Sequence, residues 1–169
     1  RKTEGRVATA ARYRSPDEDS GRWERFSPRQ GDIVISTRSK SGTTWMQMIC
    51  ALLVFETPKL PRPLSELSPW LDWLAIPESD LFAELEQQQH RRFIKTHTPL
   101  DGLPLYDDVH YVVVARDPLD MAVSLYHQGG NLDRERIAEL TGTKSRPARA
   151  QLDLVTWMTN WIRWSGHYA

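Results

Sequence analysis

This sequence has few cysteines and no long apolar runs, which argues against a disulfide-bonded secreted protein and against a membrane-spanning protein. The chain has one cysteine, Cys50, so no disulfide can form within it. Cys50 lies in an apolar run, where a small buried side chain is the expected interpretation. No stretch approaches the roughly 20 apolar residues of a membrane-spanning helix, and the first residues lack the apolar centre of a secretory signal. We therefore expect a cytoplasmic protein with no membrane span.

Net charge is also absent. The chain carries 22 basic and 22 acidic side chains, so its formal charge is zero. A neutral chain has no long-range field that would attract nucleic acid or an anionic membrane, and we expect no nucleic-acid partner. Any affinity for an anion must come from a local group of side chains.

The first 30 residues lack hydrophobic periodicity. They are rich in Arg, Ser, Pro, Asp and Glu, which predicts a flexible N-terminal arm over residues 1–30. Trp23 and Phe26 are the candidates to pin the end of this arm to the body. A chain of 169 residues makes one domain with a core of its own, and we expect this domain to span residues 31–169.

Strands and helices alternate after Gly31. Short β-branched or apolar runs predict strands at 32–36, 92–96 and 111–115. Helical spacing and capping residues predict helices at 43–55, 80–89, 118–128, 133–140 and 154–165. This alternation is typical of a three-layer α/β domain with a mostly parallel sheet flanked by helices. The run at 111–115 is typical of a strand covered on both faces, and the helix at 154–165 is expected to pack against the sheet.

A polar loop connects the first predicted strand to the first predicted helix. Free backbone N–H groups meet an anion at such a helix N-terminus. Lys40 adds a positive charge, and Gly42 lets the main chain approach the anion closely. Three hydroxyl donors follow in the same loop: Ser41, Thr43 and Thr44. The alternative is a plain helix cap of small polar residues, but the lysine and the preceding strand favour an anion site.

The second predicted strand ends in Lys95-Thr96-His97, at the carboxyl edge where open α/β sheets bind their ligands. An unperturbed histidine titrates near ~6.5, so a neutral His97 can take the proton of an attacking hydroxyl. A lone histidine is more often structural or exposed, so position alone leaves the role of His97 open. The other histidines are expected to be structural or exposed.

Arg116 follows the third predicted strand, and Ser124 lies further along the next helix. Arginine can bind phosphate with a bidentate fork. The alternative is a weak surface pair with Asp117 or Asp120. Asp117 is also the expected cap of the helix that begins at Pro118.

The three loops together resemble those of the cytosolic-type sulfotransferases that use 3'-phosphoadenosine 5'-phosphosulfate (PAPS), in a bacterial-like form. Lys40-Ser41-Gly42-Thr43-Thr44-Trp45 is similar to the phosphosulfate loop of that family. The segment from Lys95 to Pro99 resembles its general-base segment, and the segment 114–127 resembles its 3'-phosphate site. The Walker pattern of ATPases does not match, because the lysine here precedes the glycine.

This resemblance implies a P-loop-like fold and a role for each residue. The backbone and hydroxyls of residues 41–44 would bind the 5'-phosphate of PAPS, and Lys40 would stabilise the leaving phosphate. Trp45 would stack on the adenine, although its helical spacing also fits a core position. His97 would be the base, Lys95 would neutralise the sulfuryl oxygens without a metal, and the 3'-phosphate would be bound by Arg116 and Ser124.

The predicted function is transfer of a sulfuryl group from PAPS to a hydroxyl or amine acceptor, which leaves adenosine 3',5'-bisphosphate. An apolar alcohol, a phenol or a glycolipid is the expected acceptor, in a pocket drawn from Trp70, Leu71, Trp73 and Leu74, although an ordinary core would use the same residues. One alternative is a nucleotide-dependent kinase of the wider P-loop class, with Asp117 as its metal ligand. The other is a truncated, non-catalytic nucleotide-binding module.

The sequence departs from the family pattern in two places. Arg38 and Ser39 stand where the family usually has an aromatic residue and a proline, which either loosens the loop or adds charge to it. The resemblance is strong from Gly31 to about His127, and nothing matches the R-K-G stretch near the end of full members. We therefore expect a domain that is incomplete at its C-terminus, with apolar side chains exposed along 154–162 that favour self-association.

Overall fold

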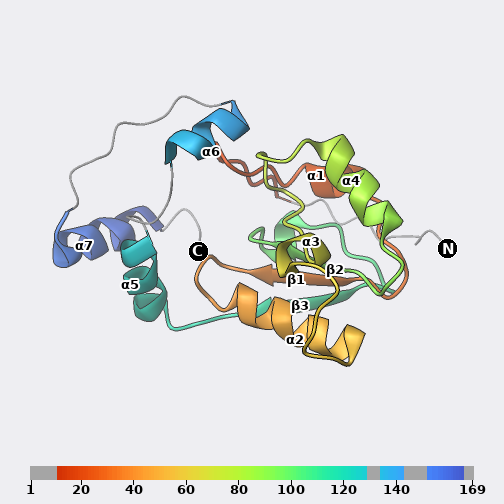
Figure 1. Ribbon diagram of the computed structural model, residues 1–169. Coiled ribbons are helices and arrows are strands. Elements are labelled where there is room, and N and C mark those ends of the chain that lie inside the picture. Colours follow the sequence, from red (N-terminus) through yellow and green to blue (C-terminus); the bar gives the residue numbers. More distant parts are fainter. Residues whose placement is uncertain (1–10, 129–133, 143–151, 166–169) are drawn as a thin grey trace.

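The computed structural model describes residues 11–128, 134–142 and 152–165 (Figure 1). Among these residues one parallel sheet forms, with the strand order β2-β1-β3. The strands are β1 (Ile33–Thr37), β2 (Phe93–Thr96) and β3 (His110–Val114). The helices are α1 (Arg22–Arg25), α2 (Thr43–Phe55), α3 (Leu64–Leu67), α4 (Glu78–Gln87), α5 (Pro118–Gln128), α6 (Arg134–Thr141) and α7 (Leu154–Ser165), with a 3-10 turn η1 (Leu100–Gly102).

The register of the sheet brings three loops to one edge. Ile33 of β1 pairs with Phe93 of β2 and with His110 of β3, so the strands begin level with one another. Because all three strands run in the same direction, their carboxyl ends also lie along a single edge. The loops that begin after Thr37, Thr96 and Val114 therefore meet there, as the sequence predicted.

Packing on both faces of the sheet confirms the three-layer α/β class. On one face Val34 and Ile94 lie in a core with Trp23, Phe26, Leu81 and Leu85, which come from α1 and its flank and from α4. On the other face Ile35 and Phe93 pack against Cys50, Ala51 and Leu67 of α2 and α3. Alternate strand residues point to opposite faces, which is why neighbours such as Val34 and Ile35 belong to different cores.

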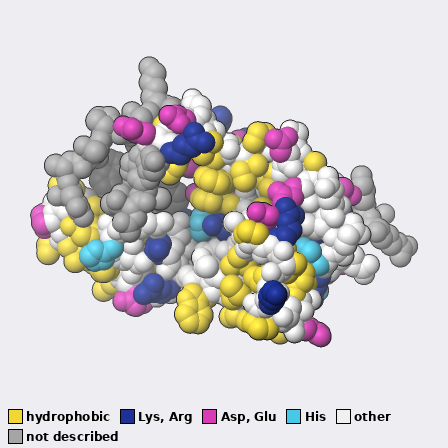
Figure 2. Space-filling view, in the orientation of Figure 1, with side chains coloured by type: hydrophobic (Ala, Val, Ile, Leu, Met, Phe, Trp, Pro, Cys, Tyr) yellow, Lys and Arg dark blue, Asp and Glu magenta, His cyan; other side chains and the backbone are white. Residues whose placement is uncertain are grey.

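Helix α2 buries a small and polar face instead of its apolar stripe. Its buried residues are Thr43, Gln47, Cys50 and Ala51. The short side chains of Thr43, Cys50 and Ala51 let the helix lie close to β1. The longer Gln47 donates a hydrogen bond from its amide to the Ser68 carbonyl at 2.8 Å. The apolar stripe predicted from the spacing, including Met48, Ile49 and Leu52, is 38 to 43% exposed. Figure 2 shows apolar side chains gathered over this outer side of α2.

Two expectations about packing are wrong for the described residues. β3 lies at an edge of the sheet, and Val113 is 58% exposed, so this strand is not covered on both faces. Its apolar run reflected strand propensity more than burial. Helix α7 packs on α5 and lies away from the sheet (Figure 1), with the Tyr126 and Trp157 rings 5.7 Å apart. The expected exposure of apolar residues in this helix is seen at Val155 and Ile162.

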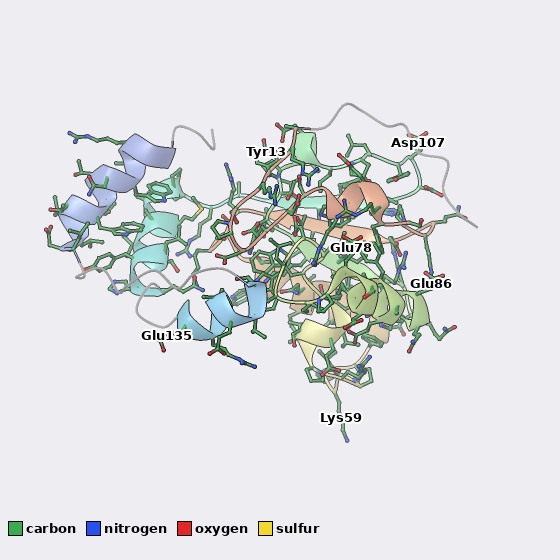
Figure 3. The ribbon with its side chains drawn as sticks, turned by 90° about the horizontal axis from the view of Figure 1, so that it is seen from above. Tyr13, Lys59, Glu78, Glu86, Asp107 and Glu135 are labelled. Atoms are coloured by element: carbon green, nitrogen blue, oxygen red, sulfur yellow. The ribbon has the colours of Figure 1, made fainter. Side chains whose placement is uncertain are left out.

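The described part of the N-terminal segment, residues 11–30, packs on the body. Trp23 and Phe26 lie in the core, as predicted. The buried Arg22 guanidinium donates hydrogen bonds to the Trp73 and Ile76 carbonyls at 2.6 and 2.9 Å. Figure 3 shows Glu78 where α1 and α4 meet, and this carboxylate pairs with Arg25 at 2.6 Å. Residues 1–10 of the predicted arm lie outside the described residues, and the division at residue 31 stays a prediction.

Candidate functional site

The loop after β1 gives the start of α2 an unusual backbone geometry. Gly42 has a φ of 105°, a conformation that glycine adopts without strain, and Lys40 has a φ of 67°. No side chain caps α2, so the alternative of a plain Ser/Thr helix cap is wrong. The first N–H groups of this helix, together with its dipole, are left to bind a negatively charged group.

The side chains of this loop divide into buried and exposed sets. The Ser41 hydroxyl is 3.3 Å from the Met121 sulfur on α5, and the Thr43 hydroxyl is hydrogen-bonded to that of Thr37. These contacts fix the loop against β1 and α5. Thr44 is exposed, and Trp45 is 80% exposed, which rules out a core position for this tryptophan. A flat ring beside the helix N-terminus can stack on a planar ligand.

His97 is held in one orientation at the end of β2. Its Nδ1 atom lies 2.7 Å from the Thr37 carbonyl oxygen, which can only accept a hydrogen bond. Nδ1 therefore carries the proton in the neutral ring, and Nε2 is left as a proton acceptor. Burial lowers the pKa of His97 most, and Lys95 lowers it further, while the bond to Thr37 raises it. The net lowered pKa keeps the ring neutral at physiological pH.

Lys95 lies beside His97 against the same tryptophan. Its Nζ atom is 4.6 Å from the centre of the Trp70 ring, and the His97 ring contacts Trp70 edge-on with centroids 4.7 Å apart. Burial lowers the pKa of Lys95, while Glu18 and Asp72 raise it. A cation that interacts with a ring face and forms no ion pair within the described residues keeps its charge available for a ligand.

A buried carboxylate braces the chain on both sides of His97. Asp72 is fully buried, and its Oδ2 atom accepts hydrogen bonds from the Thr96 hydroxyl at 2.6 Å and the Thr98 hydroxyl at 2.5 Å. The Ser36 hydroxyl also donates to the Thr98 carbonyl at 2.8 Å. The histidine is thus positioned by bonds to its own neighbours in the chain, in addition to its bond with Thr37.

Arg116 lies directly against the loop after β1. Its guanidinium donates a hydrogen bond to the Lys40 carbonyl at 3.3 Å, and it is 3.7 Å from the Asp120 carboxylate. The predicted alternative of a surface pair with Asp120 is therefore present together with a contact to the loop. The Asp117 carboxylate accepts the N–H groups of Leu119 and Asp120 at 2.9 and 3.2 Å, which confirms it as the cap of α5.

Ser124 is half-buried on α5, one turn after Met121. Residues three apart share a helix face, so Ser124 lies on the side of α5 that contacts Ser41. The structure thus brings Lys40, Ser41 and Arg116 together and places Ser124 along the same helix face.

A cavity of about 490 Å³ opens at this edge of the sheet. It is lined by the segment before β1, the loop after it, the residues that follow β2, and helices α5 and α7: Tyr13, Arg14, Ser15, Glu18, Arg38, Ser39, His97, Thr98, Pro99, Pro118, Met121, Leu125 and Trp161. His97 is the member of the predicted site that faces this space. Lys40 and Lys95 are not among the residues that line it.

The chain matches a known protein family over most of its length. A family model for the sulfotransferase domain matches residues 30–164, which is most of the chain. The chain belongs to the sulfotransferase family. This domain is 54% identical over 125 residues to a glycolipid sulfotransferase of Mycobacterium tuberculosis strain H37Ra, a match that covers 74% of this chain and 38% of the relative. It is 32% identical over 117 residues to rat sulfotransferase 1A1, covering 65% of this chain and 40% of that protein.

Solved structures agree on the fold of the sulfotransferase domain. A mouse sulfotransferase complexed with PAP matches with a TM-score of 0.51 at 20% identity, over 85% of this chain and 44% of that chain. A retinol dehydratase in complex with retinol and PAP matches with a TM-score of 0.50 at 22% identity, over 85% and 55% of the two chains. The chain therefore spans about two fifths of the length of the curated relatives given above.

The residues predicted for the acceptor pocket do not line the cavity described above, and the acceptor pocket itself stays a prediction. Leu71 lies fully buried in the core of the sulfotransferase domain, and the cavity is lined by other residues than Trp70, Trp73 and Leu74. Trp70 and Trp73 stack on each other with ring centroids 5.6 Å apart, so their apolar surface is largely used within the protein. Their hydrophobicity could not distinguish a pocket wall from core packing.

Sequence reasoning missed Glu18 and Asp72. Glu18 belongs to an Arg- and Ser-rich stretch without periodicity, and Asp72 to a stretch broken by prolines. Neither has a local signal, because each acts through contacts with residues far along the chain.

Across the described residues, no group of three or more His, Cys, Asp or Glu side chains is arranged to hold a metal. No helix in the same ranges is long and apolar enough to cross a membrane.

Proposed function

We propose that the chain is the donor-binding part of a sulfotransferase that transfers a sulfuryl group from PAPS to a hydroxyl or amine acceptor. One arrangement carries the proposal: the neutral His97, fixed by Thr37 at 2.7 Å, shares the carboxyl edge of the sheet with the uncapped start of α2. A base beside an anion site is the pairing that this reaction requires. Family membership supports the same chemistry.

The donor would be bound at both of its phosphate ends. The N–H groups at the start of α2, with the Thr44 hydroxyl and the Lys40 ammonium, suit the 5'-phosphate. The buried Ser41 and Thr43 hydroxyls act mainly by fixing this loop. Arg116 and Ser124 suit the 3'-phosphate, and Trp45 offers its exposed ring to the adenine. PAP, the adenosine 3',5'-bisphosphate product, is bound in the two solved structures that share this fold.

The chemistry of the transfer assigns one task to each charged group. Nε2 of His97 takes the proton of the acceptor hydroxyl while a new oxygen–sulfur bond forms and the bond from sulfur to the donor phosphate breaks. Negative charge develops on the departing phosphate, and Lys40 stabilises it. Lys95 neutralises the sulfuryl oxygens, so the reaction proceeds without a metal ion.

The cavity supports an acceptor with an apolar tail and a polar head, such as a glycolipid. Pro118, Met121, Leu125 and Trp161 form an apolar wall, while His97 and Glu18 belong to the polar part. The relative with 54% identity is named a glycolipid sulfotransferase. The buried free thiol of Cys50, whose pKa is raised by burial, suits a reducing cytoplasm. Self-association through α7, and the lack of a nucleic-acid partner, stay predictions.

Two measurements test the proposal on the purified protein. Calorimetry should show PAP binding that needs no magnesium, and sulfate transfer from PAPS to a panel of hydroxyl and amine acceptors should follow. His97→Ala should abolish transfer while PAP binding is kept. Loss of PAP binding in this variant would instead indicate a structural histidine.

The two alternatives predict different results. A kinase of the P-loop class predicts that ATP with magnesium binds more tightly than PAP, but its candidate ligand Asp117 already caps α5. A non-catalytic module predicts PAP binding with no sulfate transfer to any acceptor. Either result would contradict the proposed activity.

A further inference from the structure

The segment before β1 forms one wall of the cavity that contains His97. Glu18 pairs with Trp73 in a β-bridge, and its carbonyl accepts the Ser15 N–H at 2.9 Å. The Tyr13 hydroxyl, on the residue labelled in Figure 3, donates to the Asp101 carboxylate at 2.8 Å. Because both ends of this short stretch are tied to the body, the wall has a defined position relative to His97.

Glu18 presents an unpartnered carboxyl group to this cavity. Its side chain accepts no hydrogen bond from a residue within the described ranges and forms no ion pair with one, and the residue is partly buried. Its carboxyl oxygens are not fully buried, so they stay open to the cavity. A carboxyl group left in this state beside a cavity is an acceptor site for a ligand donor.

The residues that line the cavity differ in polarity from one element to the next. Glu18, Arg38 and His97 supply the polar side, whereas α5 and α7 supply Met121, Leu125 and Trp161. A ligand that fills the space therefore has an apolar part against the two helices and a polar head near the carboxyl group. Glu18 and His97 line the same cavity, so a head near the carboxyl group lies in the space that His97 also faces.

We propose that Glu18 orients the acceptor by taking a hydrogen bond from one hydroxyl of a neutral sugar-like head, so that a neighbouring hydroxyl faces Nε2 of His97. This inference rests on the proposed function and names a specificity-determining residue for it. A head that carries a carboxylate next to the reacting hydroxyl is rejected, because two like charges would meet in a partly dry cavity.

The electrostatic surroundings of Glu18 set the pH at which this selection operates. Burial raises the pKa of Glu18 to about 7, with further raising by Asp72 and Asp17 and lowering by Lys95 and Arg38. The other titratable groups that face the cavity are Tyr13, Arg14 and His97. Glu18 is therefore mostly charged at about pH 8 and mostly neutral at about pH 6.

Binding of two matched detergents to the PAP-saturated protein tests the inference. Octyl glucoside has a neutral sugar head, and octyl glucuronide carries a carboxylate on the same head. At about pH 8 Glu18→Gln should bind octyl glucoside about tenfold more weakly than the wild type, because a charge-assisted hydrogen bond is lost. It should bind octyl glucuronide more tightly than the wild type does. Both differences should shrink at about pH 6.

The controls separate this inference from folding and from the proposed function. Glu24→Gln changes an exposed carboxylate of the same segment and should leave both detergents and PAP unaffected. Glu18→Asp keeps the charge but shortens the side chain, so it should weaken octyl glucoside binding and still reject octyl glucuronide. Unchanged binding of both detergents in Glu18→Gln overturns the role of Glu18. If the two detergents bind as expected but the wild type transfers no sulfate, the proposed function is overturned and the role of Glu18 in binding is kept.

Discussion

Nδ1 of His97 lies 2.7 Å from the carbonyl oxygen of Thr37, a contact that ties the end of β1 to the residue after β2. The contact selects one tautomer, because a carbonyl oxygen accepts only an N–H. It leaves Nε2 unprotonated in the neutral ring. The same bond also joins the two loops whose side chains are proposed to act on the two sides of the transferred group.

Sulfate transfer should depend on the neutral form of His97. Because burial lowers the pKa of His97, transfer should stay constant near neutrality and fall with a midpoint below 6.5 as the ring is protonated. His97→Asn can still donate to Thr37 but has no base, so it should lose transfer by about 100-fold or more. His127→Ala, at an exposed position on α5, is the matched control. A rate profile that rises as the pH falls would contradict this role.

Gly42→Ala should destabilise the protein through its backbone. The φ of 105° at this position is strained for any residue with a Cβ, whereas the added Cβ itself would meet the Val114 side chain at an ordinary 3.8 Å. The free energy of unfolding should fall by about 1 to 3 kcal/mol in chemical denaturation, and PAP should bind more weakly. Thr44→Ala, at the exposed neighbour, should leave stability unchanged. Equal stabilities of the two variants would show that the loop tolerates another backbone conformation.

Arg116 should contribute to PAP affinity through its charge and through the bidentate hydrogen bonds that a guanidinium can form with a phosphate. Arg116→Ala should weaken PAP binding about tenfold or more in calorimetry, and Arg116→Lys should recover only part of it. Asp120→Asn removes the carboxylate that lies 3.7 Å from the guanidinium, so PAP should bind at least as tightly as to the wild type. If Arg116→Ala binds PAP with wild-type affinity, Arg116 does not bind the 3'-phosphate, and its role is limited to the contact with the Lys40 carbonyl.

Glu18 should make the stability of the protein fall as the pH rises. Its pKa is raised from 4.5 to about 7, so the folded state holds a proton that the unfolded state releases. The stabilisation is complete below about 4.5 and is lost as the pH passes about 7, with a total of up to about 3 kcal/mol. Glu18→Gln should remove this decline in denaturation experiments between about pH 5 and pH 8, and Glu24→Gln should retain it. If the stability of Glu18→Gln falls with rising pH as much as that of the wild type, the decline comes from other titratable groups.

Much of the fold could be predicted because its signals are local. The strand that begins at Ile33, the helix that begins at Thr43 and the cap at Asp117 all follow from residues within one turn or strand. The same local patterns located the three loops, because parallel strands bring their carboxyl ends to one edge.

The remaining features depend on contacts between distant residues. The spacing of Met48 and Ile49 indicated a helix face but not that Gln47 and Cys50 would be the buried side. The carboxylate of Asp72 positions His97 through Thr96 and Thr98, a relation that no sequence pattern records. Glu18 joins the cavity only because its backbone pairs with Trp73.

The cavity wall formed by residues 13–18 lies outside the stretch that the family model matches, which begins at residue 30. None of the hydrogen bonds described above for Ser41, Thr43 and Arg116 involves this wall. On the proposed role of Glu18, acceptor preference can therefore change, or be re-engineered by exchanging this short stretch, without altering those contacts.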